Sequence, residues 1–313
     1  MRGCAKPRST VLTRFSQRSR GRARLSFAPM RILVRGARLV AMAIALGWLG
    51  YTLASWFLAW NPADAGAYYG AAQRLVAGQT LYPAMNPEAH EVYRYAPWFA
   101  VLWVPLTALP EPLVAHAWSL LMLAASAVAA WPVIRLGTPA AITLGALLGA
   151  FLAETAMFGN AHPLVVALLV WSIRSRTAPL WVGVATSLKL VPILFVLPWA
   201  GRREWRKVAL AVGSAAILFA PMFLFDLSAY STSPASGLLS LYAVSPILWF
   251  AVAAATGMVA VFLALRRSPY AWLAAAVLMF LGPPRVTTSY LSFILVAVVI
   301  MLEDSPRERL AYA

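Results

Sequence analysis

The sequence predicts an all-α, polytopic membrane protein, and two observations lead to this fold class. First, 62% of its 313 residues are hydrophobic and only 12% are charged, which leaves too little polar surface for a soluble globular domain. Second, several apolar stretches are long enough for a bilayer core of about 30 Å, which needs ~20 residues per helix. Because lipid offers no hydrogen-bond partners, backbone groups must pair within each stretch, which favours helices.

The N-terminal segment, residues 1–36, is expected to be a basic tail. Ten arginines and Lys6 lie within residues 1–38 without any acidic residue, and they supply eleven of the formal net charge of +16. Such a segment is typical of an organelle transit peptide, but it could equally anchor the chain to anionic lipid on the cytoplasmic side. A third interpretation is a start assigned too early, with Met30 as the true initiator. We favour the last two and expect no nucleic-acid partner.

One membrane-embedded domain is expected over residues 37–302. Its first span is Ala37 to Trp60, and the positive tail predicts a cytoplasmic N-terminus in the plasma membrane, so that the next loop emerges on the outer face. Further apolar segments are expected at 97–109, 113–134, 138–156, 160–174, 178–200, 207–226, 246–265, 270–283 and 286–302. With these ten segments, the basic clusters at 202–207, 266–267 and 307–309 fall inside, as does the C-terminal tail, 303–313.

Two of the segments are too short to cross a bilayer. Segment 97–109 contains Pro105, and segment 160–174 starts at a proline-containing turn, FGNAHP. Proline interrupts a helix because it lacks the backbone N–H and its ring clashes with the preceding turn. We therefore expect re-entrant or tilted helices there. Irregular backbone at membrane depth is tolerated where it lines a cavity enclosed by protein, so this turn is a candidate part of a site.

A polar stretch, residues 61–97, separates the first span from the second apolar segment. Asp64 is the first acidic residue of the chain and follows the first span by four positions. A carboxylate at the headgroup level can meet a lipid-linked substrate, and partial withdrawal from water makes it a usable base for a hydroxyl group. The alternative is structural, since Asp before the helix-like run AYYGAAQRLVAG suits a helix N-cap. Spacing alone does not separate the two.

Tyrosines follow Asp64 closely. Tyr68, Tyr69 and Tyr95 could stack on sugar rings and hydrogen-bond to hydroxyl groups, as could Tyr82, Tyr93 and Trp98. Tyrosine and tryptophan also populate membrane interfaces in general, and for any one of these residues that explanation is the simpler one.

Two cationic residues are candidates for binding a phosphate. Lys189 is the only lysine inside an apolar segment, where a cation usually faces a cavity or a partner. The alternatives are an ion pair with Glu154 or Asp226, or snorkelling to the headgroups. Arg285 opens the last segment on the side predicted for Asp64, and guanidinium binds phosphate through paired donors. Interfacial anchoring is equally consistent with its position.

Asn160 and His162, with Glu154, form a polar cluster amid apolar sequence. Such groups are costly in a membrane unless they are buried and hydrogen-bonded, so they indicate either a structural turn or a binding pocket. The sequence has no HExxH, CxxC, phosphate-binding glycine loop or DxD pair. We therefore expect no cofactor and no dedicated protein metal site, and no nucleotide-sugar donor held through a metal ion. A divalent-ion requirement stays open.

Three stretches of the chain resemble glycosyltransferase family 87. The first comprises DAGAYYGAAQRLVAGQTLYP and YRYAPWFAVLWVPLTALP, which match the family's outer-loop pattern at Asp64, Tyr68, Tyr69, Leu75, Gly78, Tyr82, Tyr95, Pro97, Leu109 and Pro110. The second runs from FGNAHP to the basic turn and matches at Gly159, Lys189, Pro192, Arg203, Trp205 and Arg206. The third is PPRVTTSYLSFIL. Asn160 stands where the family has glutamine, and Ala96 replaces a proline.

The resemblance implies a type C glycosyltransferase fold with an outward-facing active site. It implies an inverting enzyme that takes a hexose, commonly mannose, from a polyprenyl-phosphate donor and passes it to a lipid- or glycan-linked acceptor. Asp64 matches the position of the loop aspartate thought to act as base. The departing phosphate would then be neutralised by Lys189 and Arg285, with Arg94, while Tyr68, Tyr69, Tyr95, Asn160 and His162 would line the sugar and acceptor pocket.

Two functions from other classes compete with this interpretation. A transporter would suit ten apolar segments with a buried lysine, although no inverted repeat is recognisable and the polar residues concentrate in one loop. A catalytically inactive membrane subunit with the same fold is the other alternative.

Overall fold

A computed structural model describes residues 28–83, 93–228, 230, 240–284 and 287–303. Within these residues all regular elements are helical, as the sequence predicts. Five of the helices are long and apolar enough to cross a membrane. They are α1 (Ala28–Leu58), α4 (Glu111–Ile134), α5 (Pro139–Met157), α9 (Trp205–Phe219) continued by the 3₁₀ turn η3 (Ala220–Leu224), and α11 (Pro246–Leu265). The protein is therefore an all-α polytopic membrane protein.

Shorter helices make up the other regular elements of the described residues. They are α2 (Ala63–Val76), α3 (Pro97–Trp103) with η1 (Val104–Ala108), α6 (His162–Ser172), α7 (Ala178–Leu188), η2 (Val191–Phe195) with α8 (Val196–Gly201), α10 (Leu241–Val244), α12 (Tyr270–Leu281), and η4 (Thr288–Phe293) with α13 (Ile294–Glu303). The segments predicted to be too short to span are confirmed as short, since α3 gives way to a 3₁₀ turn around Pro105 and α6 begins only at His162.

The apolar segment predicted over 178–200 is not one helix. Helix α7 ends at Leu188, Lys189 has extended backbone angles (φ −152°, ψ 118°), and η2 starts at Val191. Pro192 explains the break, because it cannot donate to the carbonyl of Leu188 and its ring would clash with that carbonyl. The sequence had suggested that Lys189 lies within a continuous helix. In the structure it lies at a break between helices.

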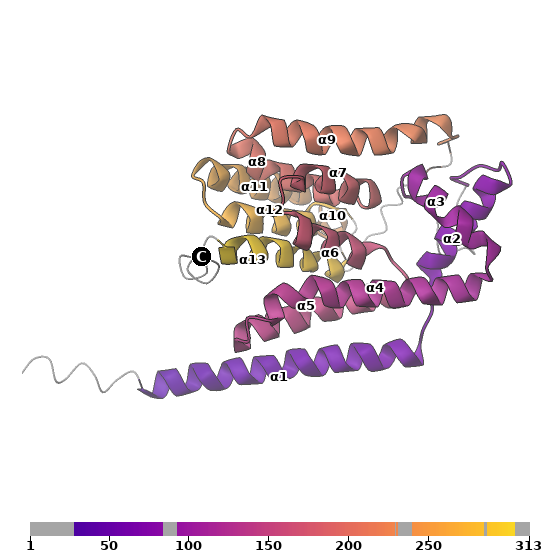
Figure 1. The fold of residues 1–313 in the computed structure, drawn as a ribbon. Coiled ribbons are helices and arrows are strands. Elements are labelled where there is room, and N and C mark those ends of the chain that lie inside the picture. The colour runs from indigo at the N-terminus through magenta and orange to yellow at the C-terminus, as the bar shows by residue number, and fades with distance from the viewer. Residues whose placement is uncertain (1–27, 84–92, 229, 231–239, 285–286, 304–313) are drawn as a thin grey trace, which may run out of the picture.

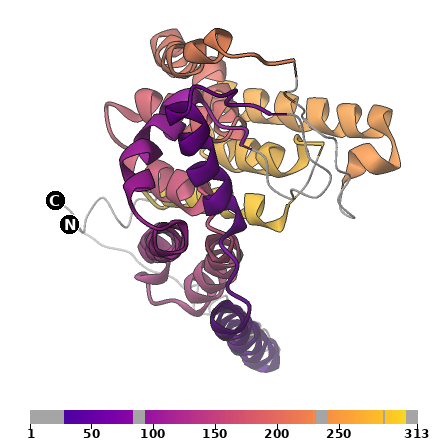
Figure 2. The ribbon, with the colours of Figure 1, turned by 90° about the vertical axis from the view of Figure 1, so that its right-hand side faces the viewer.

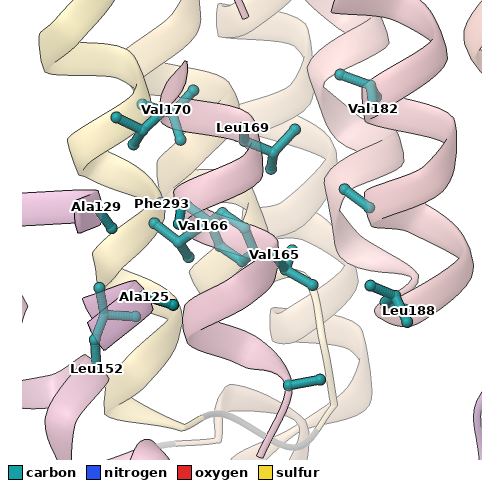
Figure 3. Close-up of a cluster of buried hydrophobic side chains, with 14 of the residues drawn as sticks. Ala125, Ala129, Leu152, Val165, Val166, Leu169, Val170, Val182, Leu188 and Phe293 are labelled. Atoms are coloured by element: carbon teal, nitrogen blue, oxygen red, sulfur yellow. The ribbon is translucent and has the colours of Figure 1, made fainter. Parts of the chain in front are cut away.

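Helix α6 forms the centre of the core. Figure 3 shows Val165, Val166, Leu169 and Val170 of α6 among side chains from neighbouring elements, which include Ala125, Ala129, Leu152, Val182, Leu188 and Phe293. A helix that is apolar on all sides is stable only when it is surrounded by protein or lipid. Because α6 is enclosed by protein, the turn that precedes it, residues 158–161, is held against a rigid element.

The periphery is apolar and exposed. Helix α1 packs against α5 and lies at the edge of the molecule, where Figure 2 shows it almost end-on. Large hydrophobic side chains of the outer helices, such as Phe57, Ile217 and Phe250, are exposed. Lipid tails are as apolar as these side chains, so an exposed apolar surface is what a membrane-embedded bundle requires.

The two ends of the bundle differ in character. Helices α2 and α3 lie at one end, and the α4–α5, α8–α9 and α11–α12 turns lie at the other, together with the start of α1 and the end of α13 (Figure 1). Those turns carry Arg135, Arg202, Arg203, Arg266 and Arg267. The basic tail before residue 28 and the cluster at 307–309 lie outside the described residues.

Candidate active site

Asp64 lies in the first turn of α2 and is half-buried. Its backbone N–H donates to the carbonyl of Phe158 at 2.9 Å, and its Oδ2 accepts a hydrogen bond from Asn160 Nδ2 at 2.8 Å. The helix N-cap is Pro62 and makes no side-chain cap bond, so the alternative interpretation of Asp64 as an N-cap is wrong. The carboxylate instead faces the turn between α5 and α6.

That turn, residues 158–161, requires a glycine at its centre. Gly159 has φ +70°, and a Cβ there would come within 2.8 Å of Ala65 Cβ. The N–H of Gly159 bonds to Ala156 and the N–H of Asn160 bonds to Thr155, which closes α5 with a left-handed glycine cap. The turn and α2 thus approach as closely as backbone contact permits, which brings Asn160 within reach of Asp64.

The orientation of the Asn160 amide is fixed on both sides. Its Oδ1 accepts from the backbone N–H of His162 at 2.9 Å, so its Nδ2 must face the carboxylate of Asp64. His162 is fully buried, and its Nε2 lies 2.9 Å from the carbonyl oxygen of Ser289 and from Ser292 Oγ. A carbonyl only accepts, so Nε2 carries the proton. Glu154, which the sequence groups with these two residues, is exposed.

Tyr68 connects α2 to the same turn. Its hydroxyl donates to the hydroxyl of Tyr95 at 2.8 Å and accepts from the N–H of Ala161 at 3.3 Å. Burial, reinforced by the neighbouring Tyr95 and Asp64, raises the pKa of Tyr68 well above its ordinary value of 10.0. Tyr68 therefore stays neutral and acts as a hydrogen-bond donor beside the carboxylate, without a negative charge of its own.

Tyr69 points elsewhere. Its hydroxyl donates to the carbonyl of Leu109 at 2.8 Å, which connects α2 to the end of η1. Tyr69 therefore lies outside the hydrogen-bond network around Asp64. Tyr82 and Tyr93 also bond to backbone carbonyls, those of Tyr95 and Ala96. These bonds fix the segment that carries Tyr95.

The Tyr95 segment is joined to the end of α7. The N–H of Ala96 donates to the carbonyl of Ser187 at 3.5 Å, and Trp98 Nε1 donates to Ser187 Oγ at 3.0 Å. Ser187 precedes Lys189 by two positions. The segment that holds the Tyr68–Tyr95 pair is therefore anchored next to the helix break that carries the lysine.

Lys189 is half-buried and lies over an aromatic ring. Its Nζ is 4.6 Å from the ring centroid of Tyr290 in η4, within the range of a cation–π contact. Neither Tyr290 nor the serines Ser289 and Ser292 were predicted as site residues. A signal for them was present, because all three belong to PPRVTTSYLSFIL, the third stretch that resembles the family.

The remaining predicted cations are placed less fully. Arg94 is half-buried beside Tyr95, and its carbonyl accepts a bond from Tyr230 at 3.3 Å. Arg285 lies outside the described residues. Among the residues that the structure describes, no three His, Cys, Asp or Glu side chains are grouped as ligands for a metal ion.

The assembled site combines a carboxylate, an oriented amide, neutral tyrosine hydroxyls and a lysine ammonium. Its parts come from α2, the 93–98 segment, the 158–161 turn, the α7–η2 break and η4. A carboxylate can remove a proton from a hydroxyl group, and an ammonium can neutralise an anionic leaving group. Group transfer to a hydroxyl from an anionic carrier is a reaction that such a set can support.

The comparisons with known proteins agree with this chemistry. Residues 93–234 match the model of glycosyltransferase family 87. The match includes Tyr95, Asn160, His162 and Lys189, while Asp64 and η4 lie outside it. A search of curated proteins and a search of solved structures gave no significant match. The match covers just under half of the chain and supports its membership of glycosyltransferase family 87.

Proposed function

We propose that the protein transfers a hexose, with mannose as the first candidate, from a polyprenyl-phosphate-linked donor to a lipid- or glycan-linked acceptor at the outer face of the plasma membrane. The observation that carries this proposal is the hydrogen bond between Asp64 and Asn160, which places a carboxylate from α2 on a turn inside the matched family region. The membrane-embedded fold suits substrates that are themselves lipids.

Asp64 is the base in this scheme. One carboxylate oxygen is held by Asn160, so the group has a defined orientation toward an acceptor hydroxyl. As the bond between the acceptor oxygen and the sugar C1 forms, the bond between C1 and the donor phosphate oxygen breaks. The hydroxyl proton passes to Asp64, and the electron pair of the broken bond leaves with the phosphate. Attack opposite the phosphate inverts the configuration at C1.

Lys189 neutralises the departing phosphate. A phosphate-linked sugar already carries a leaving group, so the enzyme gains most from positioning the reactants and stabilising the developing charge. The ammonium lies over the Tyr290 ring at a break between helices. Arg94 and Arg285 are further candidates for the same phosphate.

The distribution of basic residues supports the orientation. The turns that carry Arg135, Arg202, Arg203, Arg266 and Arg267 lie opposite α2 and α3. Basic loops remain preferentially in the cytoplasm, so this distribution supports an orientation with both termini inside and the Asp64 end outside.

Transfer of radiolabelled sugar tests the proposal. Membranes containing the wild type or Asp64→Asn are supplied with polyprenyl-phosphate mannose, and donor consumption and labelled product are followed. We expect transfer by the wild type and loss of transfer in a folded Asp64→Asn protein. Glu154→Gln is the matched control, because it removes an exposed carboxylate outside the network and should retain activity. Equal transfer by Asp64→Asn and wild type would overturn the role of Asp64. No transfer with mannose, glucose or arabinose donors would overturn the proposed reaction.

A further inference from the structure

We propose that His162 is a positioning residue that holds the base Asp64 and the cation Lys189 in register. The inference rests on the proposed function of these two groups. His162 touches neither of them through a side-chain hydrogen bond in the described residues. It lies at the start of α6 and bonds to two groups that contact them: Asn160, which donates to Asp64, and η4, whose Tyr290 ring lies under Lys189.

The link toward Asp64 runs through the backbone of His162. Its N–H donates to Asn160 Oδ1 at 2.9 Å, and the opposite end of that amide donates to Asp64 Oδ2 at 2.8 Å. Rotation or translation at the start of α6 would therefore turn the amide and release the carboxylate. The position of His162 sets the direction in which Asp64 points.

The link toward Lys189 runs through the imidazole. Nε2–H donates to the carbonyl of Ser289, and Ser292 Oγ lies at the same distance, 2.9 Å. Tyr290, the next residue, places its ring under the ammonium of Lys189 at 4.6 Å. The imidazole thereby fixes the 3₁₀ turn η4 against α6, and with it the aromatic surface on which the lysine rests.

The choice of histidine at this place calls for a reason beyond packing. The side chain is fully buried, and its Nδ1 has no hydrogen-bond partner among the described residues. Burying a polar atom without a partner costs free energy, so an apolar side chain would pack at lower cost. A ring that packs edge-on against Phe293, at 5.0 Å between centroids, and also supplies a rigid donor does what no aliphatic residue can. We infer that the cost of burying the unpaired Nδ1 is tolerated because the imidazole holds η4 in position against α6.

The expected effect is on turnover and not on donor binding. A displacement of about 1 Å between reacting groups can lower a rate by about 100-fold, while the binding of a long lipid carrier depends on many other contacts. Removing the imidazole donor should therefore lower kcat by about 10- to 100-fold and leave the KM for the donor nearly unchanged. A residue that only supports folding would instead lower the amount of active protein.

The experiment compares three variants with the wild type, each assayed per folded molecule after size-exclusion chromatography. His162→Leu removes the donor with little change in volume. His162→Gln keeps an amide N–H near the position of Nε2 and should recover most of the lost kcat. His116→Leu is the matched control, because His116 lies on α4 outside this network and should keep the wild-type kcat. An unchanged kcat in His162→Leu, or equal losses in the Leu and Gln variants, would overturn the inference.

A second measurement does not depend on activity. Hydrogen–deuterium exchange should rise in peptides covering residues 63–70 and 288–293 of His162→Leu, and return toward the wild-type level in His162→Gln. Faster exchange in 288–293 alone would show that the imidazole holds η4 without reaching Asp64, which overturns the linkage. Failure of the proposed reaction appears differently, as absence of transfer in the wild type, and exchange then decides the positioning role by itself.

Discussion

The side-chain amide of Asn160 donates to Asp64 Oδ2 at 2.8 Å, although the two residues are 96 positions apart in the chain. The contact joins the first turn of α2 to the turn between two buried helices. Because the opposite end of the amide accepts from the backbone of His162, its donor end can face only the carboxylate. The base lies on α2 and the group that orients it lies in the α5–α6 turn, so the packing of α2 against that turn sets the geometry of the site.

Replacement of Asn160 tests this orientation. Asn160→Leu keeps a side chain of similar size but removes both amide contacts, so Asp64 loses its oriented partner. We expect kcat for sugar transfer to fall by about 10- to 100-fold, as for other groups that orient a reacting side chain. Thr143→Val, which removes a hydroxyl at the far part of α5, should behave as wild type. Steady-state kinetics decide the matter, and an unchanged kcat in Asn160→Leu would remove the amide from the mechanism.

Substitution of Gly159 tests the close approach of the turn to α2. Gly159→Ala places a Cβ 2.8 Å from Ala65 Cβ at a residue with φ +70°, so the turn must shift or α2 must retreat. We expect the free energy of unfolding to fall by about 1–2 kcal/mol from the left-handed conformation alone, and sugar transfer to be lost. Gly213→Ala is the matched control, since it lies within α9 with no atom within 4 Å of its added Cβ. Gly213→Ala should be neutral or stabilising, and similar behaviour of both variants would contradict the model of a tight turn.

Exchange of Lys189 tests the phosphate-binding role. Lys189→Met keeps the length of the side chain but removes the charge, so the donor KM should rise by at least about tenfold, or kcat should fall by a similar factor. Tyr290→Leu removes the ring under the ammonium. The loss of about 0.5–1 kcal/mol of cation–π energy should change the donor KM or kcat by about two- to fivefold. Tyr290→Phe retains the ring and should lose less than Tyr290→Leu. If Lys189→Met kept both constants, the phosphate would have to bind elsewhere.

Removal of the Tyr68 hydroxyl tests the neutral donor beside Asp64. Tyr68→Phe leaves the buried N–H of Ala161 without its acceptor, which should lower the free energy of unfolding by about 1–3 kcal/mol. Tyr51→Phe on exposed α1 is the control and should be silent. An unchanged melting temperature in Tyr68→Phe would argue against the hydrogen bonds described.

The same substitution should change the alkaline limit of stability. Burial raises the pKa of Tyr68 in the folded protein above the ordinary value of 10.0, so above that pH the native state holds a proton that the unfolded chain has released. The free energy of unfolding therefore falls as the pH rises above about 10. In Tyr68→Phe this group is absent, and the fall in melting temperature from pH 9 to 11 should be shallower than in the wild type.

Parts of the site could be predicted because their residue types are unusual where they occur. A carboxylate just after the first span, a lysine in an apolar segment, and Asn160 with His162 before α6 all carry polar groups that a membrane tolerates only for a reason. The same reasoning did not predict Ser289 and Tyr290 as site residues, because a serine or tyrosine near a membrane interface is common. It also suggested that Lys189 lies within a helix, although Pro192 ends α7 before it.

By itself, the sequence determined that the chain is a helical membrane protein, which segments are apolar, and which polar groups are exceptional, because hydropathy and proline act locally along the chain. Only the tertiary structure decided that Asp64 is not an N-cap, that Tyr69 faces Leu109 while Tyr68 faces Tyr95, and that η4 lies under Lys189. These relations depend on contacts between segments far apart in sequence, and they are set by how closely backbones can pack, as at Gly159 and Ala65.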